Sequence, residues 1–454
     1  MDDHPILGAV LVAIGAGNFR SHHELPFRKA SQERYRQAQR VARPELRMRP
    51  FILVLAAAIG MTGCVTLPRD EKPPQSSQAA APVGFSSSVR ALGVDWLLDR
   101  PPADIVMGLR TAATDGSLDV LALSGGGASG AFAAGALVGL NRAHARPQFE
   151  LITGVSAGAL VAPFAFLGPE WDSQLTDAFV GDRSENLIRR RGILGLFGTS
   201  FFRGEPLRQL IDGLVTDAMI REVARESAKG RLLLVATTDL DKSATVVWDL
   251  GAIAATGGEP ARRLFRDVLV ASSSIPGVFP PVMISVSDAN GGIYQEMHVD
   301  GSVTVPFFIA PEAVLVAPDQ PQGTRGGNIY VVVNSELNIA PRTTPINTLS
   351  IVARGFLSAL SHASRTALAQ NATFAQKLGM SFRYTAIPMG DGSAGLLDFD
   401  AARMRALFDY ASTCAANGQL WLSEVKQALD EAAHPDTSVE PLSSRCPLAS
   451  RRRS

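Results

Sequence analysis

Two glycine-rich turns within residues 118–168 carry the side chain and the backbone amides that are best suited to chemistry. The first turn, 124–130, reads SGGGASG, and the second, 154–158, reads GVSAG; each follows an apolar run of strand type. Each turn is followed by small and apolar residues with helical spacing. Because the carboxyl ends of parallel strands meet at one edge of a sheet, this strand–helix–strand–helix pattern predicts that the two turns lie side by side.

The second turn has the form G-x-S-x-G, with Ser156 between Gly154 and Gly158. In this pattern a serine at a sharp strand-to-helix turn is held out at the edge of the sheet as a nucleophile. The two glycines lack the β-carbons that would collide in such a turn, and the start of the following helix favours negative charge. We therefore predict that Ser156 is a catalytic nucleophile.

The first turn offers backbone N–H groups with almost no side chains above them. Its glycines are Gly125, Gly126, Gly127 and Gly130. Such amides suit the oxygen anion that forms when a serine attacks an ester carbonyl, and losing one donor of this kind costs on the order of 3 kcal/mol in other hydrolases. We predict that these four glycines form an oxyanion hole next to the serine.

The glycine turn has two alternative interpretations. Gly125, Gly127 and Gly130 also satisfy G-x-G-x-x-G, and Glu150 follows Gly130 by 20 residues, as in a dinucleotide-binding unit. However, Glu150 falls near the start of its predicted strand, whereas a ribose-binding acid belongs at the far end. A purely structural turn is the second alternative. A P-loop is excluded because the sequence contains no G-x-x-x-x-G-K-[ST].

Three motifs of the chain occur in the order typical of one family. They are GGGASG at 125–130, GVSAG at 154–158 and DGS at 300–302, and a serine- and proline-bearing block, ASSSIPGVFP, precedes the third at 271–280. Through these motifs, residues 117–390 resemble the patatin-like phospholipases. The resemblance implies a three-layer α/β/α fold with a mostly parallel central sheet, in the α/β class.

The same resemblance implies a catalytic dyad of Ser156 and Asp300, with the glycine turn as oxyanion hole. The chain departs from the family pattern at two positions. Ser129 stands where the family usually has Arg or Lys, which removes a positive charge that would favour an anionic headgroup, and Ser302 stands where it usually has Gly or Ala. Neither departure removes a backbone donor, so hydrolysis is still expected.

A Ser–Asp dyad can hydrolyse an ester without a cofactor or a metal ion, and we expect neither. Ser156 would attack the acyl carbon, while Asp300 would accept its proton and later activate water for deacylation. A carboxylate near its ordinary pKa of ~3.9 is a poor base for a hydroxyl, so burial must raise the pKa of Asp300. The expected function is that of a phospholipase A or lysophospholipase acting on membrane lipids.

Two other functions remain open from the sequence. The order Ser156, Asp300, His362 would fit the triad of an α/β-hydrolase esterase, but His362 falls inside a helix predicted over 344–378 rather than on a loop after a strand. Alternatively, the chain is a lipid-binding envelope lipoprotein that has lost turnover. The intact serine, aspartate and glycine turn argue against this second alternative.

The first 90 residues carry a targeting pattern rather than a folded domain. Residues 48–63 combine a basic start, an apolar core and small residues before Cys64, and so resemble a bacterial lipoprotein signal peptide, in which Cys64 is acylated. An ordinary signal peptide is the alternative. We interpret 1–47 as a doubtful extension and the Pro-, Gln- and Ser-rich 64–90 as a flexible tether. This predicts a lipid-anchored protein of the bacterial cell envelope, at the outer membrane or the periplasmic face.

The rest of the chain is long enough for one large acyl hydrolase domain, predicted over 91–433, with 434–454 as a C-terminal tail. With 46% hydrophobic residues, 19% charged residues and no net charge, the composition excludes a disordered chain and a nucleic-acid binder that acts by bulk charge. Besides Cys64, the cysteines are Cys414 and Cys446, which could pair in an oxidising compartment. The sequence does not indicate an oligomeric state.

Overall fold

The computed structural model describes most of the chain that follows the predicted tether. The described residues are 69, 80–92, 102–181, 204–310, 324–338, 343–388, 399–423, 425 and 446. All the motifs lie within these ranges, in one compact unit that begins at Pro68. The extension 1–47, the signal 48–63 and Cys64 lie outside the described residues, as does the tail 434–454 apart from Cys446.

Five parallel strands form the middle and one side of a mixed sheet. In spatial order they are β5 (Leu232–Asp239), β4 (Leu151–Val155), β3 (Asp119–Leu123), β9 (Asn328–Glu336) and β10 (Ser381–Ile387). Their residues are apolar with few interruptions, as expected for strands that are covered on both faces. Since these strands run in one direction, the turns that follow β3 and β4 share one edge of the sheet.

Antiparallel strands complete the other side of the sheet. They are β6 (Ala244–Asp249), β8 (Ile293–Asp300), β7 (Val282–Ser287), β1 (Ala81–Pro82) and β2 (Arg90–Leu92). The last residues of β8 pair with the end of β5, so that Asp300 lies opposite Thr237. This pairing brings the end of β8 to the edge that carries the two glycine turns.

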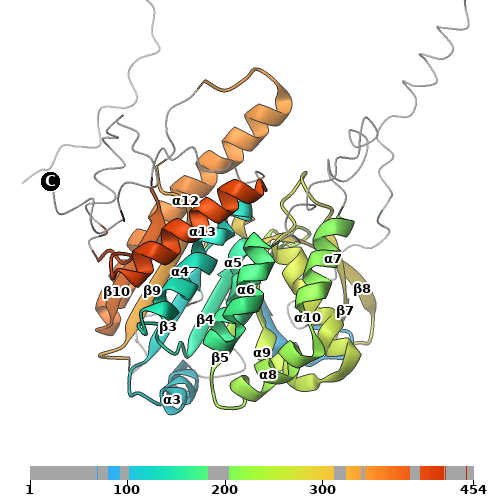
Figure 1. Cartoon of the computed structure of the whole chain (residues 1–454). Coiled ribbons are helices and arrows are strands. Elements are labelled where there is room, and N and C mark those ends of the chain that lie inside the picture. Colours follow the sequence, from blue (N-terminus) through green and yellow to red (C-terminus); the bar gives the residue numbers. More distant parts are fainter. Residues whose placement is uncertain are drawn as a thin grey trace, which may run out of the picture. The chain divides into compact units, whose positions relative to one another are not determined.

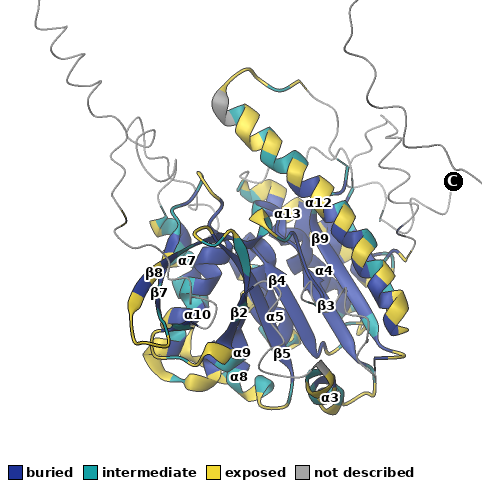
Figure 2. Ribbon diagram, turned by 180° about the vertical axis from the view of Figure 1, so that it is seen from behind, coloured by how far each residue is buried: buried dark blue, intermediate teal, exposed yellow. Residues whose placement is uncertain are grey.

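Helices cover both faces of the sheet (Figures 1 and 2). One face carries α4 (Gly130–Arg142), α5 (Ala157–Leu167), α6 (Asp172–Val180), α7 (Glu205–Leu214), α8 (Asp217–Ser227), α9 (Leu250–Thr256), α10 (Gly258–Ser272) and α13 (Ala401–Ala416). The other face carries α12 (Thr348–Leu378) and α3 (Pro102–Ala112). The predicted three-layer α/β/α arrangement with a mostly parallel sheet is therefore confirmed.

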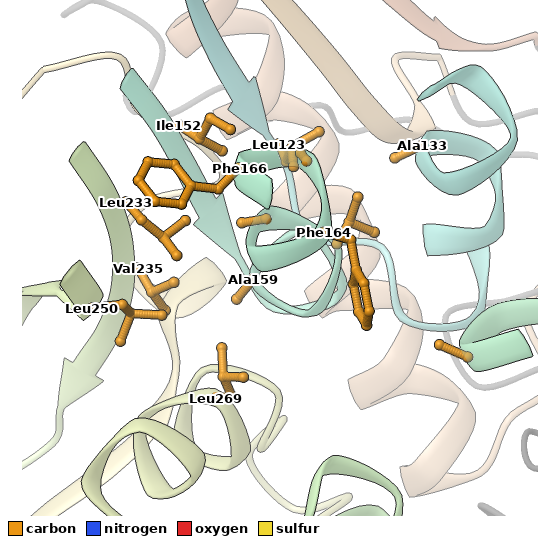
Figure 3. Packing of buried hydrophobic residues seen from close by; sticks show 14 of the residues in the cluster. Leu123, Ala133, Ile152, Ala159, Phe164, Phe166, Leu233, Val235, Leu250 and Leu269 are labelled. Carbon is orange, nitrogen blue, oxygen red and sulfur yellow. The ribbon is translucent and has the colours of Figure 1, made fainter. Parts of the chain in front are cut away.

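The core consists of two clusters, one on each face of the sheet. Leu121 and Leu123 of β3 belong to the cluster under α4 and α5, whereas Val120 and Ala122 belong to the cluster under α12. This alternation follows from the two-residue period of a strand. Figure 3 shows part of the first cluster, with side chains from three neighbouring strands beside those of α5. Burial on both faces holds the turns at the strand ends in place.

The residues at 80–90 differ from the predicted tether, because they pack against the sheet and contribute two short strands to it, at 81–82 and 90–92. β1 pairs with β7 and β2 pairs with β6, and Val89 and Leu92 are buried in the core. Arg90 is also buried: it forms an ion pair with Glu296 and donates two hydrogen bonds to the carbonyl of Ala80. The prediction of a tether rested on the Pro-, Gln- and Ser-rich residues that come before this stretch, and it overlooked the strand-forming residues that follow them.

The C-terminal tail is joined to the domain by a disulfide. Cys414 on α13 is bonded to Cys446, with the two Cα atoms 5.3 Å apart, so the pairing that the sequence left open is formed.

Among the described residues, no helix combines the length and the apolar character that a membrane crossing requires.

Candidate active site

Ser156 occupies the sharp turn between β4 and α5. Its backbone has φ 54° and ψ −124°, a conformation that residues with a β-carbon rarely adopt. A β-carbon on Gly154 would lie 2.7 Å from the Cα of Ala159, and one on Gly158 would lie 2.3 Å from the carbonyl oxygen of Leu123. Both glycines are thus required by space, as predicted for a nucleophile elbow.

Asp300 lies at the end of β8, beside this turn. The hydroxyl of Ser156 donates a hydrogen bond of 2.5 Å to Oδ2 of Asp300, and the N–H of Ser302 donates one of 2.8 Å to Oδ1. Ser156 is 3% exposed and Asp300 is 1% exposed. Two residues that are 144 positions apart in the chain therefore meet in a buried site.

Among the described residues, no cationic side chain contacts the carboxyl of Asp300. Burial raises its pKa from 3.8 to about 6, against the opposing effect of hydrogen bonds from Ser156 and Ser302. A pKa near 6 leaves the carboxylate mostly ionised at neutral pH and makes it a stronger base than an exposed aspartate. This is the shift that the sequence analysis required of Asp300.

The glycine turn packs closely against neighbouring residues. A β-carbon on Gly125 would lie 2.3 Å from the Ser302 hydroxyl oxygen, and one on Gly126 would lie 2.0 Å from the carbonyl oxygen of Asn334. Gly127 has φ 57°, in the left-handed region. A β-carbon on Gly130 would lie less than 3 Å from the ring of Phe179 and from the β-carbon of Ala157.

The amides of the four glycines are not equivalent. The N–H of Gly125 donates to the carbonyl of Pro306 at 3.3 Å, and the N–H of Gly130 turns back to the carbonyls of Gly127 and Ala128. The N–H groups of Gly126 and Gly127 have no acceptor among the described residues, and Gly127 lines the pocket beside Ser156. The geometry therefore narrows the predicted donor set to Gly126 and Gly127, whereas Gly125 and Gly130 serve close packing.

Two side chains that the sequence analysis did not single out position the turns. Asn334, at the end of β9, bonds Ser124 through its N–H and its side-chain amide, both at 2.8 Å, and accepts the N–H of Ala133 at 3.1 Å. Ser272 accepts the N–H of Ser156 at 2.9 Å and donates to the carbonyl of Ala236 at 2.8 Å. The available signal for Asn334 was a polar residue directly after the apolar run at 329–333.

An apolar pocket opens beside Ser156. It is lined by helices and loops from distant parts of the chain, including Leu160, Phe179, Leu207, Leu210, Ile275, Phe279 and Met404. Its described lining contains no Asp, Glu, Lys or Arg. The pocket can thus receive a hydrocarbon chain whose ester end reaches the serine.

His362 is not brought to this site. Its side chain is exposed on α12, where Arg365 donates a hydrogen bond of 2.7 Å to its Nδ1, and it contacts neither Ser156 nor Asp300. Because Ser156 bonds Asp300 directly, the triad with an intervening histidine does not form.

Glu150 also lies away from the glycine turn. It directly precedes β4, at the opposite end of that strand from Ser156, and accepts the N–H of Asp119 at 2.8 Å. Burial raises the pKa of Glu150 to about 7. An acid at this end cannot hold a ribose whose phosphates lie at the glycine turn, so the dinucleotide interpretation is not supported.

One group in the described part of the chain has the geometry of a metal site. Asp239, Glu296 and His298 present ligand atoms within 4.8 Å of one another. However, Lys242 forms ion pairs with both carboxylates, and Arg90 forms a second one with Glu296. These two side chains balance the negative charges without a metal ion, so we assign no metal to this group.

The fold and the geometry of the turns define an α/β protein with a serine elbow of the hydrolase type. Residues 121–311 match the family model described as patatin-like phospholipase. This part of the chain is a patatin-like phospholipase domain, which confirms the family resemblance of the motifs and indicates lipid acyl hydrolase activity in general.

Two further comparisons give less information about this chain. The crystal structure of VipD from Legionella pneumophila is similar to this chain with a TM-score of 0.35 and 12% sequence identity, over 66% of this chain and 67% of that one. The search among curated proteins found no match.

Proposed function

We propose that this protein is a serine acyl-ester hydrolase of the phospholipase A or lysophospholipase type, which acts on membrane lipids through Ser156 and Asp300. The observation that carries the proposal is the 2.5 Å hydrogen bond from the Ser156 hydroxyl to the Asp300 carboxylate, which no cation of the described residues contacts. A buried carboxylate with a raised pKa and a hydroxyl within bonding distance form a general base and a nucleophile.

Each half of the reaction uses the same pair of residues. Asp300 takes the proton of Ser156 as its oxygen bonds to the acyl carbon, and the carbonyl electrons move to the oxygen. The tetrahedral oxyanion then re-forms the carbonyl as the bond to the leaving alcohol breaks, and the alcohol takes the proton from Asp300. In the second half, Asp300 takes a proton from water, which attacks the acyl-enzyme, and returns the proton to Ser156.

The oxyanion of both tetrahedral intermediates is bound by the amides of Gly126 and Gly127. These two N–H groups have no other acceptor in the described structure. Because the site is buried, each such hydrogen bond is stronger than it would be in water. The acyl chain occupies the apolar pocket, and the absence of charged residues from its described lining supports a neutral hydrocarbon there.

We also propose that the protein acts in the bacterial cell envelope, anchored through a lipid on Cys64 after removal of 48–63. The Cys414–Cys446 disulfide supports an oxidising compartment. The intact mass of the native protein tests this: a chain that begins at an acylated Cys64 agrees with the proposal, and one that retains Met1 and carries no lipid contradicts it.

Labelling with a fluorophosphonate probe tests the catalytic proposal directly. The wild-type protein should be labelled at Ser156, and S156A should not, while both should have the same melting temperature. If the wild-type protein binds lipid but is not labelled and releases no fatty acid, the chain is a non-catalytic lipid-binding protein instead.

A further inference from the structure

The first part of α12 projects beyond the sheet edge that carries Ser156. The hydroxyl of Ser361 and the guanidinium of Arg365 both bond the carbonyl of Leu337, which directly follows β9. Residues 348–360 therefore extend past the strand ends, by about 20 Å at 1.5 Å per residue. Figures 1 and 2 show this part of α12 standing out from the neighbouring helices.

The projecting end exposes aliphatic side chains to solvent. Ile346 is 99% exposed, Ile351 53% and Val352 62%. Of the nine large hydrophobic residues that are exposed in the described part of the chain, these three fall within seven consecutive positions. Ile346 and Ile351 flank the N-cap Asn347 at positions whose side chains often pack together, yet Ile346 is in contact with almost nothing. Such a cluster of exposed apolar residues marks an interaction surface.

The charge of the helix narrows the kind of partner. From Thr348 to Leu378, α12 contains no acidic residue, and the basic Arg354 lies two positions beyond Val352, whereas Arg365 is bonded to the carbonyl of Leu337 and Lys377 lies at the other end of the helix. Apolar side chains combined with basic residues bind membrane surfaces by burial in the acyl boundary and by attraction to anionic headgroups. A surface that is apolar and free of acidic residues is thus complementary to an anionic bilayer.

We infer that the projecting end of α12, residues 346–352, inserts into an anionic lipid surface and turns the catalytic edge of the sheet toward it. The surface and the Ser156 elbow share one edge, so a single orientation serves both binding and access to substrate. The inference rests on the proposed lipid substrate for its purpose, but insertion itself requires no turnover.

A fluorescent label at position 351 tests the insertion. The full chain would carry C64S and S156A, so that a cysteine introduced by I351C is the one thiol outside the Cys414–Cys446 disulfide. On addition of vesicles of equal parts phosphatidylglycerol and phosphatidylcholine, a nitrobenzoxadiazole label at 351 should become brighter and shift to the blue. The readout reports the depth of residue 351, whatever else attaches the chain to the vesicle.

M107C is the matched control. Met107 is 63% exposed on α3, which precedes β3 and lies at the opposite edge of the sheet from Ser156. The same label at position 107 should not change. An unchanged spectrum at 351, an equal change at both positions, or a shift at 351 that follows protein concentration without vesicles would each overturn the inference; the last would indicate contact between two copies of the chain.

A pair of substitutions separates this inference from the proposed function. Replacing Ile351 and Val352 by Asp should lower hydrolysis of vesicle lipid about tenfold, because charged residues do not enter the acyl boundary, and should leave hydrolysis of a soluble short-chain ester unchanged. M107D should change neither rate. Loss of insertion with both rates intact contradicts the role of the surface in access, whereas absence of all ester hydrolysis in the wild type contradicts the proposed function alone.

Discussion

Strand β8 carries two buried carboxylates four residues apart, and their surroundings are opposite. Glu296 and Asp300 lie on the same face of the strand, and each is 1% exposed. Arg90, Lys242 and His298 surround Glu296, whereas the carboxyl of Asp300 receives its hydrogen bonds, among the described residues, from the uncharged Ser156 and Ser302.

The pKa values of the two carboxyls diverge for this reason. Burial alone would raise the pKa of Glu296, but hydrogen bonds from His298, Arg90 and Lys242 hold it well below its usual range. Burial raises the pKa of Asp300 to about 6, because the uncharged Ser156 and Ser302 are the groups in the described structure that oppose it. A buried acid that is paired with cations joins parts of the structure, and one that is left with a hydroxyl is prepared to accept a proton.

The difference between the two carboxyls is tested most directly by neutralising each of them in a separate variant. D300N should lower kcat/KM for ester hydrolysis by about a thousandfold or more, since the general base is lost, while E296Q should leave kcat/KM within about threefold. Steady-state kinetics on a soluble ester measure both. A D300N variant that keeps a tenth of the activity would show that another group accepts the proton.

The effect on the free energy of unfolding should be the reverse: neutralising Glu296, and not Asp300, should destabilise the fold. E296Q should lower the free energy of unfolding by about 3 kcal/mol, because Arg90 and Lys242 would then be buried beside a neutral amide. Urea denaturation measures this change. E259Q is the matched control: Glu259 is more than half exposed and its oxygen lies 3.8 Å from Arg262, so its loss should cost less than about 0.5 kcal/mol. Equal effects of both substitutions would contradict a structural role for the buried group.

The raised pKa of Asp300 also predicts how the stability of D300N depends on pH. Because the folded state binds the Asp300 proton more tightly than the unfolded state, the wild type loses stability as pH rises from about 4 to 6, and asparagine does not titrate. D300N should therefore be more stable than the wild type by about 3 kcal/mol at pH 7, and the gap should close toward pH 4. A gap that is independent of pH would mean that Asp300 is not desolvated.

The smallest effect is expected at Ser302, whose hydroxyl and N–H both lower the pKa of Asp300. S302A removes the hydroxyl alone, so the pKa of Asp300 should rise by about half a unit to one unit. Activity depends on the ionised carboxylate, so the acid limb of the kcat/KM profile should move to higher pH by that amount. The rate at alkaline pH is the internal control and should hardly change; an unmoved acid limb would show that the hydroxyl does not act on Asp300.

Much of the site could be predicted because its chemistry is local. A G-x-S-x-G turn works only where two β-carbons are absent, and the observed contacts at Gly154 and Gly158 bear this out. The supports of the turns could not be predicted, since Asn334 bonds Ser124 across 210 positions and Ser272 bonds Ser156 across 116. The short strands at 81–82 and 90–92 were missed for the same reason: Arg90 has its partner at Glu296.

By itself, the sequence determined the strand-turn-helix units, the alternating core and the position of the serine turn, because backbone sterics and apolar periodicity act between near neighbours. The prediction for Asp300 came from the resemblance of its motif to the family. Only the tertiary structure decided that Glu296 meets cations and Asp300 does not, and that Gly126 and Gly127 keep their amides unbonded among the described residues while Gly125 does not. Those outcomes depend on desolvation and on partners brought from distant strands, and a linear sequence does not encode them locally.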